Sequence, residues 1–323
     1  MKIHQPYSKV IEDMNLLQSR SEDFVFAFNY AKTSGFCLLL NEVDKSFIDF
    51  SINHNHKHSV KPSFNLEISH ISYQEYLTSY NKIIKEIENG NSYLCNLTFK
   101  TPILVNLDLQ QIFELSYAKY KLWIKDEFTV FSPERFVRIE NDRIYTNPMK
   151  GTIDASIDNA ENLLRTNLKE LSEHTTIVDL LRNDLSIVSL DVKVDRFQYM
   201  EKIQKHNGGL IQMSSQISGN IRSKFKNEYG SLMDLITPAG SICGAPKEKT
   251  CQIISDVESY ERGYYTGIFG TYQAGILDCA VMIRFIENDN GQLFFKSGGG
   301  IHSLSNPIKE YEEMKSKIYV PIF

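Results

Sequence analysis

Apolar side chains recur every three or four positions in two parts of the chain, which is the pattern of a helix with one buried face. The first part begins after Ser72, which a glutamate follows at capping-box spacing, and Gly90 ends it. The second part covers residues 159–184. A third helix is expected over residues 306–319, because Asn306 can cap it and the next residue is a proline.

Runs of residues that are typical of strands cover residues 24–30 and 36–41. Residues 280–287 and 292–296 flank a polar turn that ends in Gly291, so they are expected to form a β-hairpin. Strands at the start, helices in the middle and antiparallel strands near the end predict an α+β fold rather than a doubly wound α/β fold.

The composition is that of a globular protein, because 323 residues with 42% hydrophobic content can bury a substantial core. No linker rich in proline, glycine or serine divides the chain, so we expect one intertwined domain over residues 1–323. The net charge of −5 gives no electrostatic attraction to nucleic acid or to an anionic membrane. No apolar run approaches the roughly 20 residues of a membrane-spanning helix, and the polar first ten residues do not resemble a signal peptide. A cytoplasmic protein that binds a small substrate or a protein partner is therefore expected.

The cysteines are scattered and include no Cys-x-x-Cys pair, so neither a zinc site nor a disulfide framework is expected. They are Cys37, Cys95, Cys243, Cys251 and Cys279. Buried, unreactive thiols are the ordinary interpretation for such residues. The alternating His54, His56 and His58 have polar neighbours, which favours a solvated loop over a metal site.

Two pairs of glutamates have the spacing that places both members on one helix face, Glu170 with Glu173 and Glu310 with Glu313. If the two pairs meet, they form an acidic cage, and ligands that are all oxygen suit Mg²⁺. The alternative is two solvated acidic faces, with Glu313 paired to Lys317 four residues later.

Two residues are candidates for acid–base or nucleophilic chemistry. Lys150 lies in the segment Pro148-Met149-Lys150-Gly151-Thr152, where it is either a nucleophile or an ordinary surface lysine. Glu134 lies between apolar neighbours, where it is either a protonated general acid or the partner of a cation such as Arg135.

Two further features could bind an anionic ligand. Arg284 is expected within the strand at 280–287, where its charge needs a carboxylate from the protein or from a substrate. The glycines Gly298, Gly299 and Gly300 would let backbone amides approach an anion, although a β-bulge or a tight bend explains them equally well.

Several motifs, taken in order over residues 73–317, resemble those of one family, the chorismate-utilising enzymes. The motifs are Gly90-Asn91-Ser92-Tyr93, Asn96-Leu97-Thr98, Ser132-Pro133-Glu134-Arg135-Phe136, Pro148-Met149-Lys150-Gly151-Thr152, Glu173-His174, Asp179-Leu180-Leu181-Arg182-Asn183-Asp184-Leu185, Pro238-Ala239-Gly240-Ser241, Gly244-Ala245-Pro246-Lys247, Ile283-Arg284, Gly298-Gly299-Gly300-Ile301 and Glu310-Tyr311-Glu312-Glu313. The family includes component I of aminodeoxychorismate synthase and of anthranilate synthase, and the isochorismate and salicylate synthases. The resemblance implies antiparallel sheets flanked by helices.

The resemblance also implies a metal site. Glu173 and Glu313 would bind Mg²⁺, with Glu170 and Glu310 in or next to its shell, and the metal would hold the ring carboxylate of chorismate. The acidic cage is then preferred to the solvated faces.

Further substrate-binding residues follow from the same resemblance. Tyr265 and Arg284 would receive the enolpyruvyl carboxylate, and the amides of Gly298, Gly299 and Gly300 would contact the substrate. Lys317 and Thr152 would also line the site.

Within the family, the residue at position 150 distinguishes the reactions: aminodeoxychorismate synthases typically have lysine there and anthranilate synthases typically have alanine. Lys150 therefore implies amination of chorismate at C4 through a covalent lysine adduct, with Glu134 as the acid, in p-aminobenzoate and folate synthesis. Ammonia would come from a separate glutamine amidotransferase (glutaminase) subunit. Anthranilate synthase component I is the nearest alternative, followed by isochorismate or salicylate synthesis.

The chain also departs from the family pattern. Met149 replaces an isoleucine, Gln212 stands where the family often has a histidine near the ring, and Leu304 stands where an aspartate is common. The N-terminal portion, residues 1–70, is abbreviated, so control by tryptophan is not expected. A non-catalytic chorismate-binding partner is the alternative from another class, and the presence of Glu134 and Lys150 argues against it.

Overall fold

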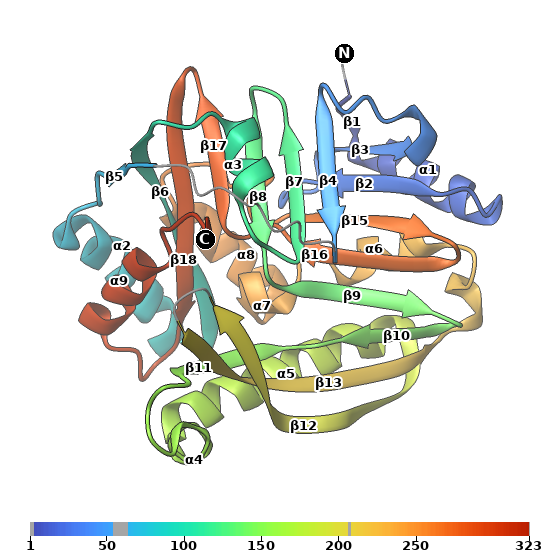
Figure 1. Ribbon diagram of the computed structural model, residues 1–323. Coiled ribbons are helices and arrows are strands. Elements are labelled where there is room, and N and C mark those ends of the chain that lie inside the picture. Colours follow the sequence, from blue (N-terminus) through green and yellow to red (C-terminus); the bar gives the residue numbers. More distant parts are fainter. Residues whose placement is uncertain (1–2, 54–63, 206–207, 323) are drawn as a thin grey trace.

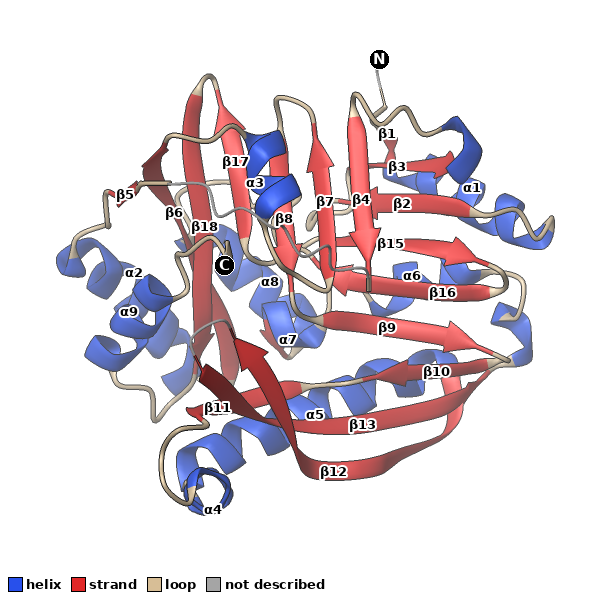
Figure 2. Cartoon of the chain, viewed as in Figure 1, coloured by secondary structure: helices blue, strands red, loops and turns tan. Residues whose placement is uncertain are grey.

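Two antiparallel sheets flanked by helices form the framework of the protein (Figures 1 and 2). The structure is a computed structural model that describes residues 3–53, 64–205 and 208–322. The strand and helix pattern thus confirms the predicted α+β class. The three alternating histidines at 54–58 lie outside the described residues.

The first sheet brings together segments that are far apart in the sequence, because β2 (Phe24–Phe28) pairs with β15 (Ile268–Gln273). Its order among the described residues is β1 (Gln5–Pro6), β3 (Ser34–Leu39), β2, β15, β16 (Ile276–Val281), β9 (Arg135–Glu140), β10 (Arg143–Thr146), β13 (Gly208–Ile221) and β11 (Met149–Asp154), with β12 (Ser189–Lys205) also paired to β13. The predicted strands at 24–30 and 36–41 are β2 and β3.

The second sheet centres on the long strands β6 (Leu94–Val105) and β18 (Gln292–Ile301), which pair over nine residues without a register shift. Its order is β14 (Gly244–Ala245), β6, β18, β17 (Phe285–Asp289), β8 (Phe128–Ser132), β7 (Tyr120–Ile124) and β4 (Ile48–Ile52), with β5 (Leu66–Ile68) also paired to β6. Side chains from both sheets, such as Ala27, Phe269, Leu122 and Val130, pack into one core.

Helices cover the outer faces of both sheets. They are α1 (Tyr7–Ser19), α2 (Tyr73–Glu88), α3 (Leu109–Leu115), α4 (Ala160–Thr166), α5 (Leu168–Val188), α6 (Tyr229–Ile236), α7 (Gly240–Cys243), α8 (Lys247–Val257) and α9 (Pro307–Ser316), with short 3₁₀ turns at Leu40–Glu42 and Ser223–Phe225. In Figure 1, α5 lies along β13 and α9 lies beside β18, and both pairs are in contact. No helix in the described parts of the chain is long and apolar enough to cross a membrane.

The helix α2 forms as the sequence predicts. The Ser72 hydroxyl accepts a hydrogen bond from the backbone N–H of Glu75 at 3.1 Å, and the helix ends before Gly90. Its apolar face, including Tyr76 and Ile83, is buried. A local capping signal and a regular apolar face are therefore sufficient to define this helix.

The helical region predicted at 159–184 is interrupted. Asn167 has extended backbone angles, φ −75° and ψ 101°, which end α4 and start α5. Its side chain accepts hydrogen bonds from the N–H groups of Lys169 and Glu170 and so caps α5. The break fixes the direction in which α5 leaves the cap, and the first two turns of α5 carry Glu170 and Glu173.

The prediction of one strand over 280–287 is wrong. β16 ends at Val281 in the first sheet, and β17 begins at Phe285 in the second sheet. Arg284 lies between them with φ +55°, so it occupies the crossing between sheets rather than the middle of a strand. The predicted hairpin does form, but its first strand begins only at Phe285, where β17 starts and pairs with β18 across the turn.

Candidate active site

A cavity of about 460 Å³ is lined by residues from both sheets and from α5, α7 and α9. It contains every residue that the sequence predicts for the site except Glu170 and Glu310, which lie beside it. The three departures from the family pattern, Met149, Gln212 and Leu304, also line it. The fold therefore gathers residues that are far apart in the sequence into one enclosed space.

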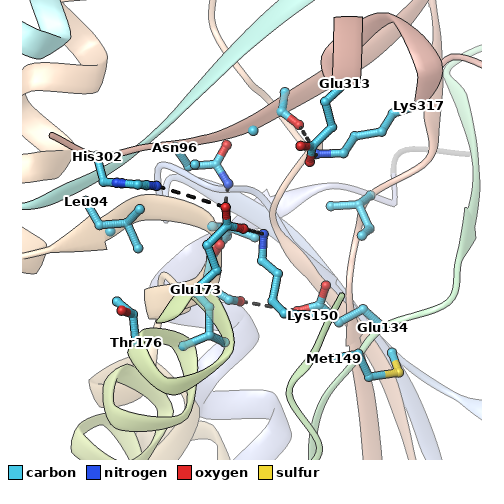
Figure 3. Close-up of a pocket in the computed structure, with 18 of the residues that line it drawn as sticks. Leu94, Asn96, Glu134, Met149, Lys150, Glu173, Thr176, His302, Glu313 and Lys317 are labelled. Atoms are coloured by element: carbon cyan, nitrogen blue, oxygen red, sulfur yellow. Dashed lines mark hydrogen bonds and ion pairs between the residues drawn. The ribbon is translucent and has the colours of Figure 1, made fainter. Parts of the chain in front are cut away.

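Lys150 reaches this cavity from an irregular part of β11. The pairing of β11 with β13 shifts register between Met149 and Thr152, and Gly151 has φ +82°. A side chain at that φ is strained, which explains the glycine. The Lys150 Nζ lies 3.9 Å from Glu173 Oε2, and Figure 3 shows both side chains pointing toward each other. Lys150 is thus a cavity residue, not a surface turn residue.

Glu134 lines the cavity just after the end of β8. Its Oε1 accepts a hydrogen bond from the Ser241 hydroxyl at 3.3 Å. Burial raises the pKa of Glu134, although the charge of Lys150 opposes the shift. The alternative pairing with Arg135 is wrong, because Arg135 pairs with Asp278 at 2.9 Å. Glu134 is therefore a carboxyl group suited to carry a proton.

The glutamates of α5 and α9 meet at one end of the cavity. Lys169 Nζ lies 3.4 Å from Glu173 Oε1 and 3.6 Å from Glu310 Oε1, so one ammonium group bridges the two helices. Burial raises the pKa of Glu170 and of Glu310, and the neighbouring carboxylates Glu173 and Glu313 add to these shifts. The side chain of Glu310 is only 5% exposed, so this carboxylate does not form a solvated face.

Glu313 forms the ion pair that its spacing suggests, with its Oε1 3.0 Å from Lys317 Nζ. Burial alone would raise the pKa of Glu313, but the charge and hydrogen bond of Lys317 and the charges of Lys150 and Lys169 together outweigh it, and the pKa lies below its usual value. Burial also lowers the pKa of Lys317, whose ammonium donates a hydrogen bond to Gly298 O at 2.8 Å. Lys317 thus connects α9 to the glycines of β18.

The carboxylates fit a hard divalent cation in chemical type, since all of their donors are oxygen. Within the described residues, no three His, Cys, Asp or Glu side chains gather closely enough to hold a metal by themselves. Mg²⁺ usually keeps several waters and takes one or two carboxylates plus substrate oxygens, so a site of this open kind is compatible with it.

Arg284, Tyr265 and the glycines of β18 also line the cavity and are candidates to bind an anion. Arg284 Nε has no hydrogen-bond partner among the described residues, and its guanidinium carbon lies 5.3 Å from the centre of the Tyr319 ring. Tyr265 is 4% exposed, and burial raises its pKa, so its hydroxyl stays protonated. Gly298–Gly300 pair regularly with β6, which excludes the β-bulge or tight bend as their explanation.

Several residues at the site were not singled out by sequence. Lys169 stands four residues before Glu173, a visible helix pairing, but its second partner Glu310 is distant in the chain. His302 lines the cavity, with Nε2 4.0 Å from Glu173 Oε1, and belongs to no motif. Asp184 belongs to one of the family motifs but had no role assigned to it; it holds the start of α7, because it pairs with Lys247 at 2.7 Å and accepts the Gly240 N–H at 2.9 Å.

Comparison with known proteins identifies the family. A model of the chorismate binding enzyme family matches residues 11–322. An uncharacterized PabA-like protein of Haemophilus influenzae is 42% identical over 315 residues, which cover 97% of this chain and 96% of that protein. Aminodeoxychorismate synthase component 1 of Bacillus subtilis is 30% identical over 74% of this chain and 53% of its own length. Anthranilate synthase component 1 of Acetivibrio thermocellus is also 30% identical, over 77% of this chain and 52% of its own length. This chain thus spans about half the length of these last two relatives.

The fold has solved counterparts. The menaquinone-specific isochorismate synthase of Escherichia coli superposes with a TM-score of 0.73 at 14% identity, over 97% of this chain and 81% of that one. The similarity confirms the expected arrangement of antiparallel sheets flanked by helices. The family model that matches residues 11–322 establishes that the chain belongs to the chorismate-binding enzyme family.

Proposed function

We propose that the protein aminates chorismate at C4 and so acts as component I of an aminodeoxychorismate synthase. The observation that carries the proposal is the position of Lys150, which enters the cavity beside Glu173 and on the same side as Glu134. Relatives named for amination at C4 and for anthranilate synthesis are equally similar in sequence, so overall similarity does not choose between the two reactions. A lysine at this position favours amination.

Two displacements then account for the reaction. The neutral amine of Lys150 attacks ring C2, the two ring double bonds shift, and the C4 hydroxyl leaves as water with a proton from Glu134. Ammonia next attacks C4, the double bonds shift back, and the bond between C2 and the Lys150 nitrogen breaks. Glu134 regains its proton from solvent. The balance is chorismate plus ammonia to 4-amino-4-deoxychorismate plus water.

Burial prepares Glu134 for the first of these steps. A carboxyl group with a raised pKa keeps its proton at a higher pH and can donate it to the leaving hydroxyl. Ser241 holds the carboxyl group in place from the start of α7. Arg284 and Tyr265, which also line the cavity, would bind the enolpyruvyl carboxylate.

Mg²⁺ is the cofactor that we propose for the site. Glu173 and Glu313 would hold it, with Glu170 and Glu310 beside them, and the ion when bound would neutralise the ring carboxylate and favour loss of the hydroxyl. The chain's own cations, Lys169 and Lys317, keep these carboxylates paired.

A separate glutamine amidotransferase subunit is the proposed source of ammonia. The product would then feed p-aminobenzoate and folate synthesis. Ammonium salts at mildly alkaline pH should replace this subunit in a test with the purified chain, because they supply the free ammonia that attacks C4.

The proposal is tested by identifying the product. The purified protein is incubated with chorismate, Mg²⁺ and ammonium, with and without a lyase that converts aminodeoxychorismate to p-aminobenzoate. Appearance of p-aminobenzoate only with the lyase supports the proposal. Direct release of anthranilate, isochorismate or salicylate would refute it, and so would chorismate that remains unconsumed both with ammonium and with an added amidotransferase subunit.

A further inference from the structure

His302 presents a hydrogen-bond donor to the cavity that the proposed reaction does not use. Its Nε2 is buried and has no hydrogen-bond partner among the described residues. About a quarter of the side chain, 26%, is exposed, and the ring lines the cavity. A buried polar atom without a partner costs free energy in the free protein, so a ligand that supplies an acceptor would recover it.

The backbone around His302 fixes which ring nitrogen carries the proton. The N–H of Leu304 donates to Nδ1 at 3.2 Å, so Nδ1 is the acceptor and the neutral ring holds its proton on Nε2. The turn itself is closed twice, since the His302 N–H donates to the Ser305 hydroxyl and the Ser305 N–H donates to the His302 carbonyl. The Tyr80 hydroxyl binds the Ser305 carbonyl from α2. The imidazole is therefore held in one tautomer and one orientation.

The donor lies at the carboxylate end of the cavity. Nε2 is 4.0 Å from Glu173 Oε1, which is beyond hydrogen-bond range, and Figure 3 shows the ring directed at this carboxylate. An oxygen of a ligand that enters beside Glu173 would meet the Nε2 proton.

We propose that His302 binds the ring carboxylate of the substrate through its Nε2 proton and is a specificity-determining residue of the site. The inference rests on chorismate being the substrate, as proposed above, but not on which product forms. Arg284 and Tyr265, which line the same cavity, would hold the second carboxylate, so the three residues together would select a molecule with two carboxylates.

The test measures binding without turnover. The ligand is 3-(1-carboxyvinyloxy)benzoate, an aromatic analogue with both carboxylates, and its affinity is measured by calorimetry with and without Mg²⁺. The variants are His302→Leu, which removes the donor, and His302→Gln, whose amide N–H₂ can replace Nε2. His70→Leu is the control, because it makes the same substitution at an exposed histidine that does not line the cavity. Thermal unfolding confirms that each variant is folded.

We expect His302→Leu to bind about tenfold more weakly, as for loss of one hydrogen bond to a charged group, and the other two variants to stay within about threefold of wild type. Equal binding by all variants overturns the proposal. Equal weakening of His302→Leu and His302→Gln also overturns it, because the ring would then act by shape. With 2-phenoxyacrylate, which lacks the ring carboxylate, a persisting tenfold difference would refute the assignment to that group. A wrong product assignment leaves all of these results unaffected, since no turnover is involved.

Discussion

Alanine substitution of two neighbouring glycines should separate the binding of substrate from the packing of β18. A Cβ atom at Gly299 would lie 3.6 Å from Lys317 Nζ and 3.9 Å from Glu310 Oε2, which are ordinary contacts. A Cβ atom at Gly298 would instead overlap the Leu97 carbonyl oxygen of the paired strand. The first methyl group enters the cavity, whereas the second collides with the sheet.

The expected magnitudes differ accordingly. Gly299→Ala should leave stability unchanged or raise it by about 0.4–1 kcal/mol, because alanine restricts the unfolded chain. Gly298→Ala should lower the free energy of unfolding by about 1–3 kcal/mol through overpacking. If the substrate lies against the backbone at Gly299, the methyl group displaces it from one contact worth about 1 kcal/mol, and chorismate should bind about fivefold more weakly.

Urea unfolding gives the stabilities, and calorimetry with the aromatic analogue gives the affinities. The decisive result is the affinity of Gly299→Ala at wild-type stability. Wild-type affinity in this variant would refute the reasoning, because it would mean that no ligand approaches this part of β18. Loss of stability in Gly299→Ala equal to that in Gly298→Ala would show instead that the cavity wall has no room for a methyl group.

Three further predictions concern charge. Glu134→Gln should lower kcat by a factor of about 10²–10⁴ if Glu134 is the acid. Because burial raises the Glu134 pKa, the wild type should also lose stability relative to this variant as pH rises from about 4 through that pKa. An equal dependence of the unfolding free energy on pH in both proteins, measured with urea, would contradict the assignment. Lys169→Gln should bind Mg²⁺ about fivefold more tightly by calorimetry, because the Lys169 ammonium group no longer competes for two carboxylates. The control variant Lys315→Gln should bind Mg²⁺ with the wild-type affinity. Weaker binding of Mg²⁺ by Lys169→Gln would exclude this competition. Asp184→Ala should cost about 3 kcal/mol in urea unfolding, because it leaves Lys247 and a buried N–H unpaired, and a loss below about 1 kcal/mol would contradict this role.

The sequence predicts those elements whose signals are local. The helix after Ser72 is defined by its own cap and apolar face, and β17 and β18 by the turn between them. The change of sheet at Arg284 has no such signal, because the strands before and after this residue pair in different sheets and their pairing is not visible in the sequence. The helix α1 was not predicted, since its buried residues Val10, Met14 and Gln18 include a polar side chain.

The same distinction applies to the site. The resemblance names the residues that line the cavity, and the spacing of Glu170 and Glu173 is readable on one helix. The bridge of Lys169 to Glu310 and the approach of His302 to Glu173 arise only when α5, α9 and the loop after β18 are packed together. Interactions of this kind depend on tertiary structure, so sequence patterns do not reveal them.

The role of Lys150 is the central claim, and the most direct test compares its product with that of a matched variant. Lys150→Ala and the surface control Lys315→Ala are incubated with chorismate, Mg²⁺ and ¹⁵N-ammonium, and aminodeoxychorismate is quantified by mass spectrometry. The account predicts that Lys150→Ala still binds the aromatic analogue but forms no labelled aminodeoxychorismate, while the control forms it at the wild-type rate. Labelled aminodeoxychorismate from Lys150→Ala at the wild-type rate would contradict the account.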